Sequence, residues 1–569
     1  MYVRYPLCWD YPKSCMITII YLNLFFIFIS FLHSDDIKLQ NIEAGRRGDS
    51  YKVWVYFDKK DSNRIVDLDD ASIKRRIKHN LFEPTKYDYL INQNYINEIK
   101  ELDAEVNIQS RWLNAVSVIV DIEKINLIKK LPFVKKIKPV YQHTKKKSIQ
   151  DIGNMNDQSR NIEYGSSYDQ IEQINCRIPH IAGYFGQGVR VLYLDTGYEL
   201  GHTAYDSLNL IAQYDFVNND ENTANETDQE ILENQDNHGT LCLSVMAGYA
   251  PGNLIGPAFK SEYLLAKTEI MAEEIQQEED NYVAALEWGE SLGADIACAS
   301  LGYLDWYSYE DLDGNSAVTT IAIDIASNLG VLCINSAGNE GDDPWYYIIT
   351  PADADSVISV GAVNRDGIIA NFSSRGPTYD GRIKPEVCAL GVSTYCVRSN
   401  TENEYRAASG TSFSAPLAAG AAAVILSANP EWTNMQVREA MMMTASLSNS
   451  PDNMYGYGIL NTWAAINYQF TTAIKDEEIT PNALKVFDAY PNPFNPATSI
   501  RIQSESILPN IILSIFNVNG QLIQTLEKGA TNAHSMDIKW DGSRNSSGVY
   551  FIKIAWPGGS RTQKITLLN

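Results

Sequence analysis

The sequence predicts an α/β fold with a doubly wound parallel sheet in its largest part, residues 163–470. Two observations predict it. Short runs such as VRVLYLD and GVLCINSAGN are apolar nearly throughout, whereas a strand with one face in water alternates apolar and polar residues. Between such runs lie helical patterns, for example NYVAALEWGESLG and VTTIAIDIASNLG. Buried strands that alternate with helices form a parallel sheet covered on both faces.

Residues 51–142 predict a separate, small α+β unit. The order is a strand (YKVWVYF), two amphipathic helical stretches, a strand (AVSVIVDI), a helix (EKINLIKKL) and a short strand (VKKIKPVY). A polar segment with the basic run Lys145–Lys147 follows, and we interpret residues 143–162 as a linker. The expected order is therefore a small mixed unit, a linker and the parallel-sheet domain.

A further unit, an all-β sandwich, is expected at residues 485–569. It follows the polar stretch TTAIKDEEITPN and contains short strand patterns, among them ILSIFNVNG, MDIKW and GVYFIKIA. The turn signals NG, DG and SSG separate these patterns. A chain of 569 residues is too long for one core, so several folded units are expected.

The first 34 residues have the pattern of an export signal. Residues 16–32 are almost continuously apolar, Arg4 and Lys13 precede them, and the polar HSDD follows. This run is slightly long for a signal and slightly short for a membrane span, so a membrane anchor is the alternative. The residues before Met16 are atypical of a signal, which makes Met16 a second candidate for the start of translation.

The charge distribution excludes one class of partner and suggests another. The net charge of −24 disfavours binding to nucleic acid or to an anionic membrane. Residues 51–150 carry 20 Lys and Arg against 13 Asp and Glu, so this stretch is basic beside an acidic remainder. Opposite charges of this kind suggest two parts of the chain that attract each other.

Most of the eight cysteines lie in the signal region or in apolar runs typical of a core. In a core, a free cysteine behaves as a small apolar side chain. Only Cys388 and Cys396 are spaced for a local disulfide, and the sequence leaves the bridge and the two free thiols equally open.

Three segments each place one reactive side chain beside glycine at the end of an expected element. Asp195 ends the strand in VRVLYLDTG, His238 begins a helix in NHGTLCLSVMAG, and Ser412 begins an Ala-rich helix in SGTSFSAPLAAG. An aspartate can fix the imidazole tautomer, the imidazole can remove a hydroxyl proton, and the serine can then attack. These residues predict a nucleophilic catalytic triad.

Asn339 supplies a group that such a triad lacks. It follows an apolar strand in VLCINSAGNEG, where its carboxamide is expected to be exposed. An amide N–H could stabilise the oxyanion of a tetrahedral intermediate, together with the backbone N–H of Ser412.

Five segments together resemble the subtilisin-like serine proteases over about residues 163–470. They are LDTG (194–197), HGT (238–240), SLG (300–302), SAGN (336–339) and GTSFSAP (410–416), the last with Phe413 where many members carry Met. The resemblance implies a serine endopeptidase acting on proteins or peptides, with Asp195, His238 and Ser412 as triad and Asn339 as oxyanion donor. It also implies that the backbone of Ser300, Leu301 and Gly302 pairs with the substrate as an added strand.

Each of these signals alone has an ordinary structural interpretation, such as a helix cap for Ser412. Two other classes compete with the protease. A non-catalytic adhesion protein with a decayed protease fold is disfavoured because no triad residue is missing. An aspartic or metal-dependent hydrolase is disfavoured because DTG occurs once and HExxH is absent.

Neither a metal nor an organic cofactor is required by these motifs. The acidic run from Asp215 to Asp236 could bind Ca²⁺, as members of the family often do, but it lacks a recognisable ligand spacing. We therefore expect a solvated loop and no metal ligand there. His202, seven residues after Asp195, is expected to be a packed structural residue and not part of the catalytic chemistry.

Two flanking units also resemble known modules. Residues 51–142 are similar in position and charge to the inhibitory propeptide of the family, which implies a self-processing zymogen whose segment VKKIKPVYQ lies in the substrate cleft. Residues 485–569 resemble the sorting domain of bacterial type IX secretion through YPNPFNPAT, IFNVNGQLI and SSGVYFIKI. The resemblance implies bacterial secretion machinery as a partner and a protein exported across the inner and the outer membrane, secreted or at the cell surface.

Overall fold

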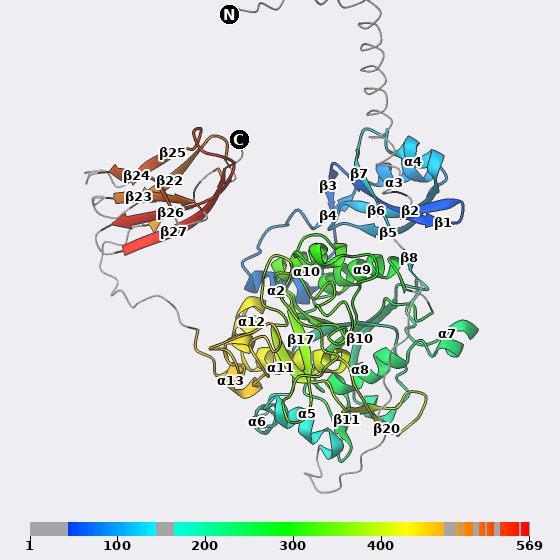
Figure 1. Ribbon diagram of the computed structural model, residues 1–569. Helices are drawn as coiled ribbons and strands as arrows, with labels where there is room; N and C mark the ends of the chain where they lie inside the picture. The colour runs from blue at the N-terminus through cyan, green and yellow to red at the C-terminus, as the bar shows by residue number, and fades with distance from the viewer. Residues whose placement is uncertain are drawn as a thin grey trace, which may run out of the picture. The chain divides into compact units, whose positions relative to one another are not determined.

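The computed structural model contains two compact units, one within residues 1–468 and one within residues 469–569 (Figure 1). The residues that it describes are 42, 44–140, 142–143, 164–272, 274–470, 485–487, 489, 491–492, 494–503, 511–517, 521–528, 535–556 and 559–567. The expected signal segment 1–34 and nearly all of the expected linker 143–162 lie outside these residues.

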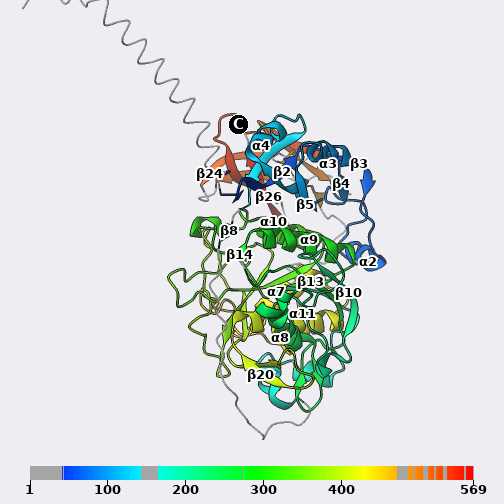
Figure 2. The same cartoon turned by 90° about the vertical axis from the view of Figure 1, so that its right-hand side faces the viewer.

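A seven-stranded, wholly parallel sheet forms the centre of the larger unit (Figures 1 and 2). In spatial order its strands are β10 (Asn209–Asp215), β13 (Glu262–Lys267), β9 (Arg190–Asp195), β15 (Ile296–Ala299), β16 (Leu332–Ser336), β17 (Ile358–Val363) and β18 (Val387–Leu390). Along β9, Val191 and Tyr193 face one core, whereas Leu192 and Leu194 face the other. Both faces are buried, which explains the apolar strands and confirms the predicted parallel sheet.

Helices cover both faces of this sheet. One core lies against α8 (Asn237–Ala247) and α11 (Thr411–Ala428), and the other lies against α9 (Gln277–Ser291) and α10 (Val318–Asn328). Shorter elements complete the unit: α5 (Tyr168–Gln173), α6 (Arg177–Ile181), α7 (Asp228–Glu233), α12 (Asn434–Met443), α13 (Thr462–Ile466), β11 (Tyr249–Ala250), β12 (Leu254–Ile255), β19 (Thr394–Val397) and β20 (Tyr405–Ala408). This is the doubly wound arrangement that the sequence predicts.

Helix α11 is the apolar centre of one core. Its 18 residues have a mean hydropathy of 1.5, enough by length and composition to cross a membrane, but 89% of them are buried inside the domain. Its small residues permit this burial: a Cβ added at Gly420 would lie 2.3 Å from Cγ of Pro257. We therefore interpret α11 as a core helix of a folded domain.

The strand order changes direction next to β9, the first strand of the sheet in the chain. The following strands, β10 and β13, lie on one side of β9, and β15 to β18 lie on the other. In a doubly wound sheet, functional sites lie at the carboxyl ends of the strands beside such a switch point. Asp195 ends β9, and Ser300 directly follows β15.

Residues 44–140 form an antiparallel sheet with two helices on one face. Its elements are β1 (Arg46–Arg47), β2 (Ser50–Phe57), β5 (Glu105–Ser110), β6 (Ala115–Asp121), β7 (Val134–Pro139), α3 (Gln93–Lys100) and α4 (Ile122–Ile128). A third helix, α2 (Asp70–Lys78), lies between the paired strands β3 (Lys60–Ile65) and β4 (Tyr89–Ile91) in the chain. The predicted α+β class is confirmed, but β3 and β5 escaped prediction because their residues, KDSNRI and EVNIQS, are mostly polar.

The C-terminal unit has two antiparallel sheets around one core. The first contains β21 (Lys485–Val486), β22 (Ala497–Gln503) and β25 (Ser535–Asp541); the second contains β24 (Leu522–Lys528), β23 (Ile511–Asn517), β26 (Gly548–Trp556) and β27 (Gly559–Leu567). In β22, Ile500 and Ile502 are buried while Arg501 is exposed. This alternation is typical of a sandwich strand and agrees with the predicted fold.

All six cysteines within the described residues are free and buried. Cys388 lies on β18 with its Sγ 3.5 Å from the carbonyl oxygen of Tyr455. Cys396 lies on β19 with its Sγ 3.5 Å from the carbonyl oxygen of Arg406. Of the two alternatives left open for this pair, the structure therefore has the free thiols.

Candidate active site

Asp195 and His238 form a hydrogen-bonded pair at the switch point. Asp195 is fully buried at the end of β9, and His238 is the second residue of α8. His238 Nδ1 lies 2.7 Å from Asp195 Oδ1, which also accepts a hydrogen bond of 2.7 Å from the backbone N–H of Thr196. With Nδ1 as the donor to the carboxylate, the lone pair of the neutral ring is on Nε2, so the ring is oriented as a base.

The glycines of the two motifs allow this close approach. A Cβ added at Gly239 would lie 2.3 Å from the carbonyl oxygen of Gly197 and 3.0 Å from Asp195 Cβ. The N–H of Gly239 donates to Thr196 Oγ1 at 3.2 Å. Glycine in HGT is thus a steric requirement for bringing the start of α8 against the end of β9.

The pKa of His238 lies well above the usual value of 6.5. Burial of the ring lowers this pKa, but the charge of Asp195 and its hydrogen bond to the ring raise it more. The side chain of His238 is 20% exposed, so the ring still reaches solvent at the site. The ring therefore becomes a neutral base at higher pH than an ordinary histidine.

Ser412 lies at the start of α11 and is 8% exposed. Its Oγ donates a hydrogen bond of 3.0 Å to the carbonyl oxygen of Ser300, not to His238. The ring centroid of the next residue, Phe413, lies 6.3 Å from the ring centroid of His238, so the start of the helix lies beside the imidazole. Before attack, the hydroxyl has to rotate toward His238; hydrogen bonds in unliganded active sites are often misaligned in this way.

Asn339 is held with its amide nitrogen available. Its Oδ1 accepts hydrogen bonds from the backbone N–H of Thr411 at 2.9 Å and from Thr411 Oγ1 at 3.1 Å. Because the oxygen is occupied by these two donors, the Nδ2 group of Asn339 is the end left for a ligand. Thr411 immediately precedes Ser412, so the two candidate groups are positioned by adjacent residues.

The segment Ser300–Gly302 is hydrogen-bonded to the protein at Ser300 and Leu301, while Leu301 and Gly302 are half-buried. The carbonyl of Leu301 accepts a hydrogen bond of 2.8 Å from Asn335 Nδ2. Ser300 Oγ donates to the carbonyl of Ser412 at 2.8 Å, and the hydroxyl of Tyr193 lies 2.7 Å from Ser300 Oγ. These contacts fix Ser300 beside Ser412. The sequence did not indicate Tyr193, which supports Ser300, or Thr411, which supports Asn339.

Cys242 also belongs to the surroundings of the site and was predicted only as a core residue. It is buried one turn after His238 in α8, with its Sγ 3.7 Å from His238 Nε2. The i, i+4 spacing on one helix was the signal that could have placed it against the ring.

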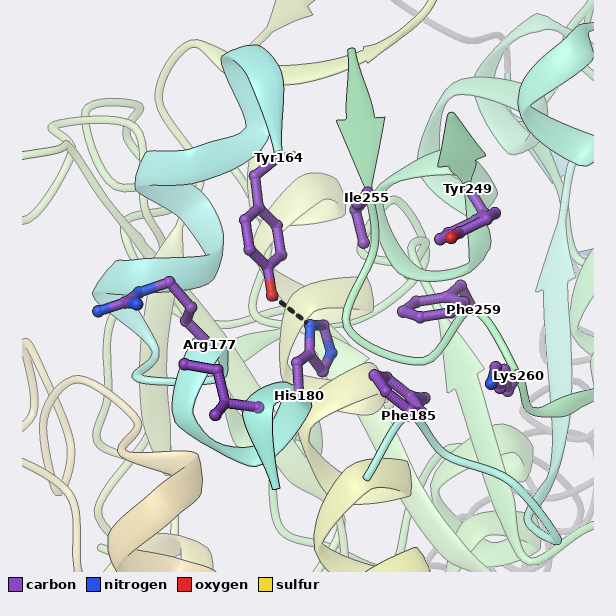
Figure 3. Close-up of a pocket in the computed structure, with 9 residues that line it drawn as sticks. Tyr164, Arg177, His180, Phe185, Tyr249, Ile255, Phe259 and Lys260 are labelled. Carbon is purple, nitrogen blue, oxygen red and sulfur yellow. Dashed lines mark hydrogen bonds between the residues drawn. The ribbon is translucent and has the colours of Figure 1, made fainter. Parts of the chain in front are cut away.

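Two other histidines of the parallel-sheet domain have structural partners. Nδ1 of His202 accepts from the N–H of Ala204 at 3.1 Å, and its Nε2 lies 2.9 Å from the carbonyl of Glu404, which confirms the structural interpretation. His180 lies in a separate pocket of about 350 Å³, where the Tyr164 hydroxyl is 2.9 Å from its Nδ1 (Figure 3). None of the candidate catalytic residues lines that pocket.

The acidic run between Asp215 and Asp236 is organised around a lysine. Lys267 Nζ is fully buried and lies 2.8 Å from Asp215 Oδ2 and 2.5 Å from Glu230 Oε1. Oxygens of Asp215, Asp220 and Glu226 come within 4.8 Å of one another, and Asp215 also contacts the ammonium group of Lys267. The expectation of a solvated loop is wrong for two members of the run, Asp215 and Glu230, which are buried.

The sheet of residues 44–140 packs on helix α9 through buried carboxylates. Trp54 Nε1 and Ser117 Oγ donate to Asp280 at 2.6 and 2.7 Å. Ser110 Oγ donates to Glu287 at 2.5 Å. The N-terminal part thus supplies hydrogen bonds to acidic side chains that would otherwise be costly to bury.

Glu290, on the same helix, is bound by arginines of the N-terminal part. Arg76 donates from Nε and Nη2 to its two oxygens, each at 2.9 Å, Arg111 Nη2 donates to Oε2 at 3.2 Å, and Arg75 also contacts it. All of these side chains are at most 8% exposed. The suggested attraction between the basic segment and the acidic remainder has its structural basis in these ion pairs.

The end of the N-terminal part reaches another edge of the larger domain. Strand β8 (Gln142–His143) pairs antiparallel with β14 (Glu274–Ile275). The chain beyond β8 enters the linker, whose placement lies outside the described residues.

Fold and site together define a class. A buried aspartate bonded to a histidine, with a helix-start serine beside them at the switch point of a doubly wound sheet, is typical of serine hydrolases. A sequence model described as the subtilase family matches residues 186–458. The chain is 30% identical over 370 residues to subtilisin amylosacchariticus from Bacillus subtilis subsp. amylosacchariticus and to subtilisin E from Bacillus subtilis (strain 168), covering 64% of this chain and 84% of each relative. The chain therefore belongs to the subtilase family.

Further comparisons agree with this assignment. The chain is 31% identical over 309 residues to a subtilisin from Bacillus pumilus, covering 54% of this chain and 99% of the relative. A model described as the peptidase S8 propeptide domain of Bacteroidota matches residues 52–155, and one described as a secretion system C-terminal sorting domain matches residues 488–567. These matches confirm the resemblances to the protease family, to its propeptide and to the sorting domain. The protein is a secreted or cell-surface serine endopeptidase made as a zymogen, with a sorting domain for export.

Proposed function

We propose that Asp195, His238 and Ser412 form the catalytic triad of this endopeptidase. The observation that carries the proposal is the 2.7 Å hydrogen bond between His238 Nδ1 and the buried carboxylate, because it leaves Nε2 to act as the base. Ser412 Oγ turns from the carbonyl of Ser300, loses its proton to Nε2 and attacks the carbonyl carbon of the peptide. His238 then gives the proton to the departing amine, and an acyl-enzyme remains.

Asn339 Nδ2 and the backbone N–H of Ser412 are the proposed donors to the oxyanion of the tetrahedral intermediate. Water later hydrolyses the acyl-enzyme with His238 as base again. The steps need no cofactor, because nucleophile, base and oxyanion donors are all groups of the chain.

Reaction with a serine-reactive phosphonyl fluoride tests the nucleophile directly. The reagent should abolish peptide hydrolysis and add its mass to the peptide that contains Ser412. Mass spectrometry of the digested protein would show the adduct, and an adduct on another serine would assign the nucleophile elsewhere.

Replacement of Asn339 by Leu should lower kcat by about a hundred- to a thousand-fold and leave KM nearly unchanged. The amide meets the oxygen only in the transition state, and the magnitude is that measured for this kind of donor in a subtilisin. Steady-state kinetics on a peptide substrate would give both constants.

Asn339→Asp is the matched control for this prediction. It keeps an oxygen for Thr411 and removes the N–H donor, so kcat should fall as far or farther than in the Leu variant. A defect confined to KM in either variant would contradict the oxyanion role.

The substrate is proposed to bind as an added strand along Ser300, Leu301 and Gly302. Leu301 directs its carbonyl to Asn335, and in an extended segment the neighbouring residues direct their polar groups the other way, where a substrate strand could pair with them. Main-chain pairing of this kind accepts many sequences, which fits proteins and peptides as substrates.

The unit 51–142 is proposed to be an inhibitory propeptide that the protease domain, 163–470, removes by a cut within 143–162. Support comes from the ion pairs with α9 and from the pairing of β8 with β14, which brings the end of the propeptide to the protease domain. Export is proposed to use a signal peptide at 1–34 and the sandwich at 485–569, which bacterial secretion machinery would bind. No role in nucleic-acid binding is proposed.

Glu290→Gln should shorten the lag before the processed protein becomes active. Loss of the carboxylate leaves buried arginines without their partner, and removal of one member of a buried ion pair costs on the order of 2–5 kcal/mol in binding. Propeptide release should therefore be at least about 30-fold faster. Hydrolysis of a peptide substrate followed from the start of processing would measure the lag.

Glu439→Gln, a change of the same kind on the exposed surface of α12, should leave the lag unchanged. An unchanged lag in the Glu290 variant as well would show that the ion pairs do not hold the propeptide.

A further inference from the structure

Two glycines line the slot beside the proposed acyl position. Gly302 ends the segment after β15, and Gly338 precedes Asn339 after β16. Since β15 and β16 are neighbouring parallel strands, paired from Ile296 with Leu332 onward, both segments leave the sheet at the same edge. With Ser412 and Asn339 as the proposed contacts of the scissile carbonyl, we take the side chain of the residue that carries this carbonyl to enter between the two segments.

The side chain of Ile349 occupies the space between these glycines. A Cβ added at Gly302 would lie 2.8 Å from both Cδ1 and Cγ1 of Ile349. A Cβ added at Gly338 would lie 3.1 Å from Cγ1 and 3.3 Å from Cγ2 of the same side chain. Ile349 is 8% exposed, so little of its side chain reaches solvent.

The backbone around Ile349 is fixed to both walls. Its N–H donates to the carbonyl of Ala337 at 3.2 Å. The next residue, Thr350, forms two backbone hydrogen bonds with Tyr303. The N–H of Tyr303 donates to the carbonyl of Thr350 at 2.7 Å, and the N–H of Thr350 donates to the carbonyl of Tyr303 at 3.2 Å. The side chain therefore cannot leave the slot by a shift of the backbone without breaking these bonds.

We propose that Ile349 is the specificity-determining residue of this protease, and that it restricts the residue on the acyl side of the cleaved bond to Gly, Ala or Ser. This inference rests on the proposed function, since it takes Ser412 and Asn339 as the groups around the reacting carbonyl. An aromatic or long aliphatic side chain at that position would collide with the branched carbons of Ile349. A methyl or hydroxymethyl group would rest on them.

Peptides that differ only at this residue test the proposal on the full-length, self-processed protein. The wild type should cleave the Ala peptide with a kcat/KM at least about 100-fold higher than that of the Phe peptide, since one methylene group in a tight pocket already changes specificity by 10- to 200-fold. In Ile349→Ala the ratio should fall at least about 30-fold, and Ile349→Val should lie between the two.

Ile348→Ala is the matched control. Ile348 is fully buried in a different cluster, with Leu312, Ala337 and Ala352, so its loss should lower stability without changing the ratio. A wild-type preference for Phe or Leu, or a ratio that Ile349→Ala leaves unchanged, would overturn the proposal. A preference for Lys or Arg would also overturn it and would assign the subsite to nearby carboxylates such as Glu340.

The same assay separates failure of the inference from failure of the proposed function. If the proposed function fails, the Ser412→Ala variant would still hydrolyse these peptides. If only the inference fails, hydrolysis would depend on Ser412 but would show a different preference.

Discussion

Ser412→Ala should lower kcat by about a million-fold, the loss measured for this residue type in subtilisin itself. The hydroxyl is the only proposed nucleophile, and Ala fits the buried helix start, where Ser412 is 8% exposed. Its fold should therefore persist while acyl-enzyme formation stops. Peptide hydrolysis by the purified variant, with circular dichroism as a check of folding, would measure both.

The same variant should remain uncut between residues 143 and 162, because the cut is proposed to be self-processing. Ser414→Ala is the matched control: Ser414 lies on the same helix and donates to the carbonyl of Thr411 at 2.9 Å, away from the proposed reaction. That control should mature and hydrolyse peptides. Activity above a few per cent in folded Ser412→Ala, or maturation at the normal rate, would contradict the assignment.

Asp195→Asn should lower kcat by about ten-thousand-fold, the loss seen when the triad aspartate of a serine protease becomes an amide. The carboxylate is fully buried and 2.7 Å from His238 Nδ1, so its charge stabilises the imidazolium that forms when Ser412 attacks. Asparagine keeps the size of the side chain but removes this charge.

The pH dependence distinguishes this loss from misfolding. His238 has to be neutral to accept a proton, and Asp195 raises its pKa, so the wild-type kcat/KM should rise with pH through a midpoint above 6.5. In Asp195→Asn the pKa should fall, and the midpoint should move to lower pH. Asp206→Asn, an exposed change, should move neither rate nor midpoint. A lower rate with an unmoved midpoint would show that Asp195 acts only through the fold.

The candidate catalytic residues could be predicted because each one depends on local constraints. Gly239 has to lack a side chain for α8 to approach β9, and α11 has to be built from small residues to be buried. Such requirements leave short motifs in the sequence, and their common order indicated a single site. The parallel sheet could be predicted for a similar reason, since both faces of β9 are buried and residues 191–194 on both faces are therefore apolar or aromatic.

Features that depend on partners far away in the chain left no such pattern. The N-terminal strands β3 and β5 are mostly polar, and α2 is fixed by ion pairs to Glu290, more than 200 residues later. The acidic run suggested a solvated loop because the sequence does not show that Lys267 is buried against it.

The sequence was therefore sufficient for the fold class, the family and the residues expected to carry out the chemistry, because these follow from periodicity and from short motifs with strict local geometry. The tertiary structure alone decided which end of the Asn339 amide is free, which residue fills the slot between Gly302 and Gly338, and how the propeptide is held. Each of these depends on contacts between segments that are distant in sequence, such as Thr411 with Asn339 and Ile349 with Gly302. Such contacts exist only once the sheet has brought those segments to one edge.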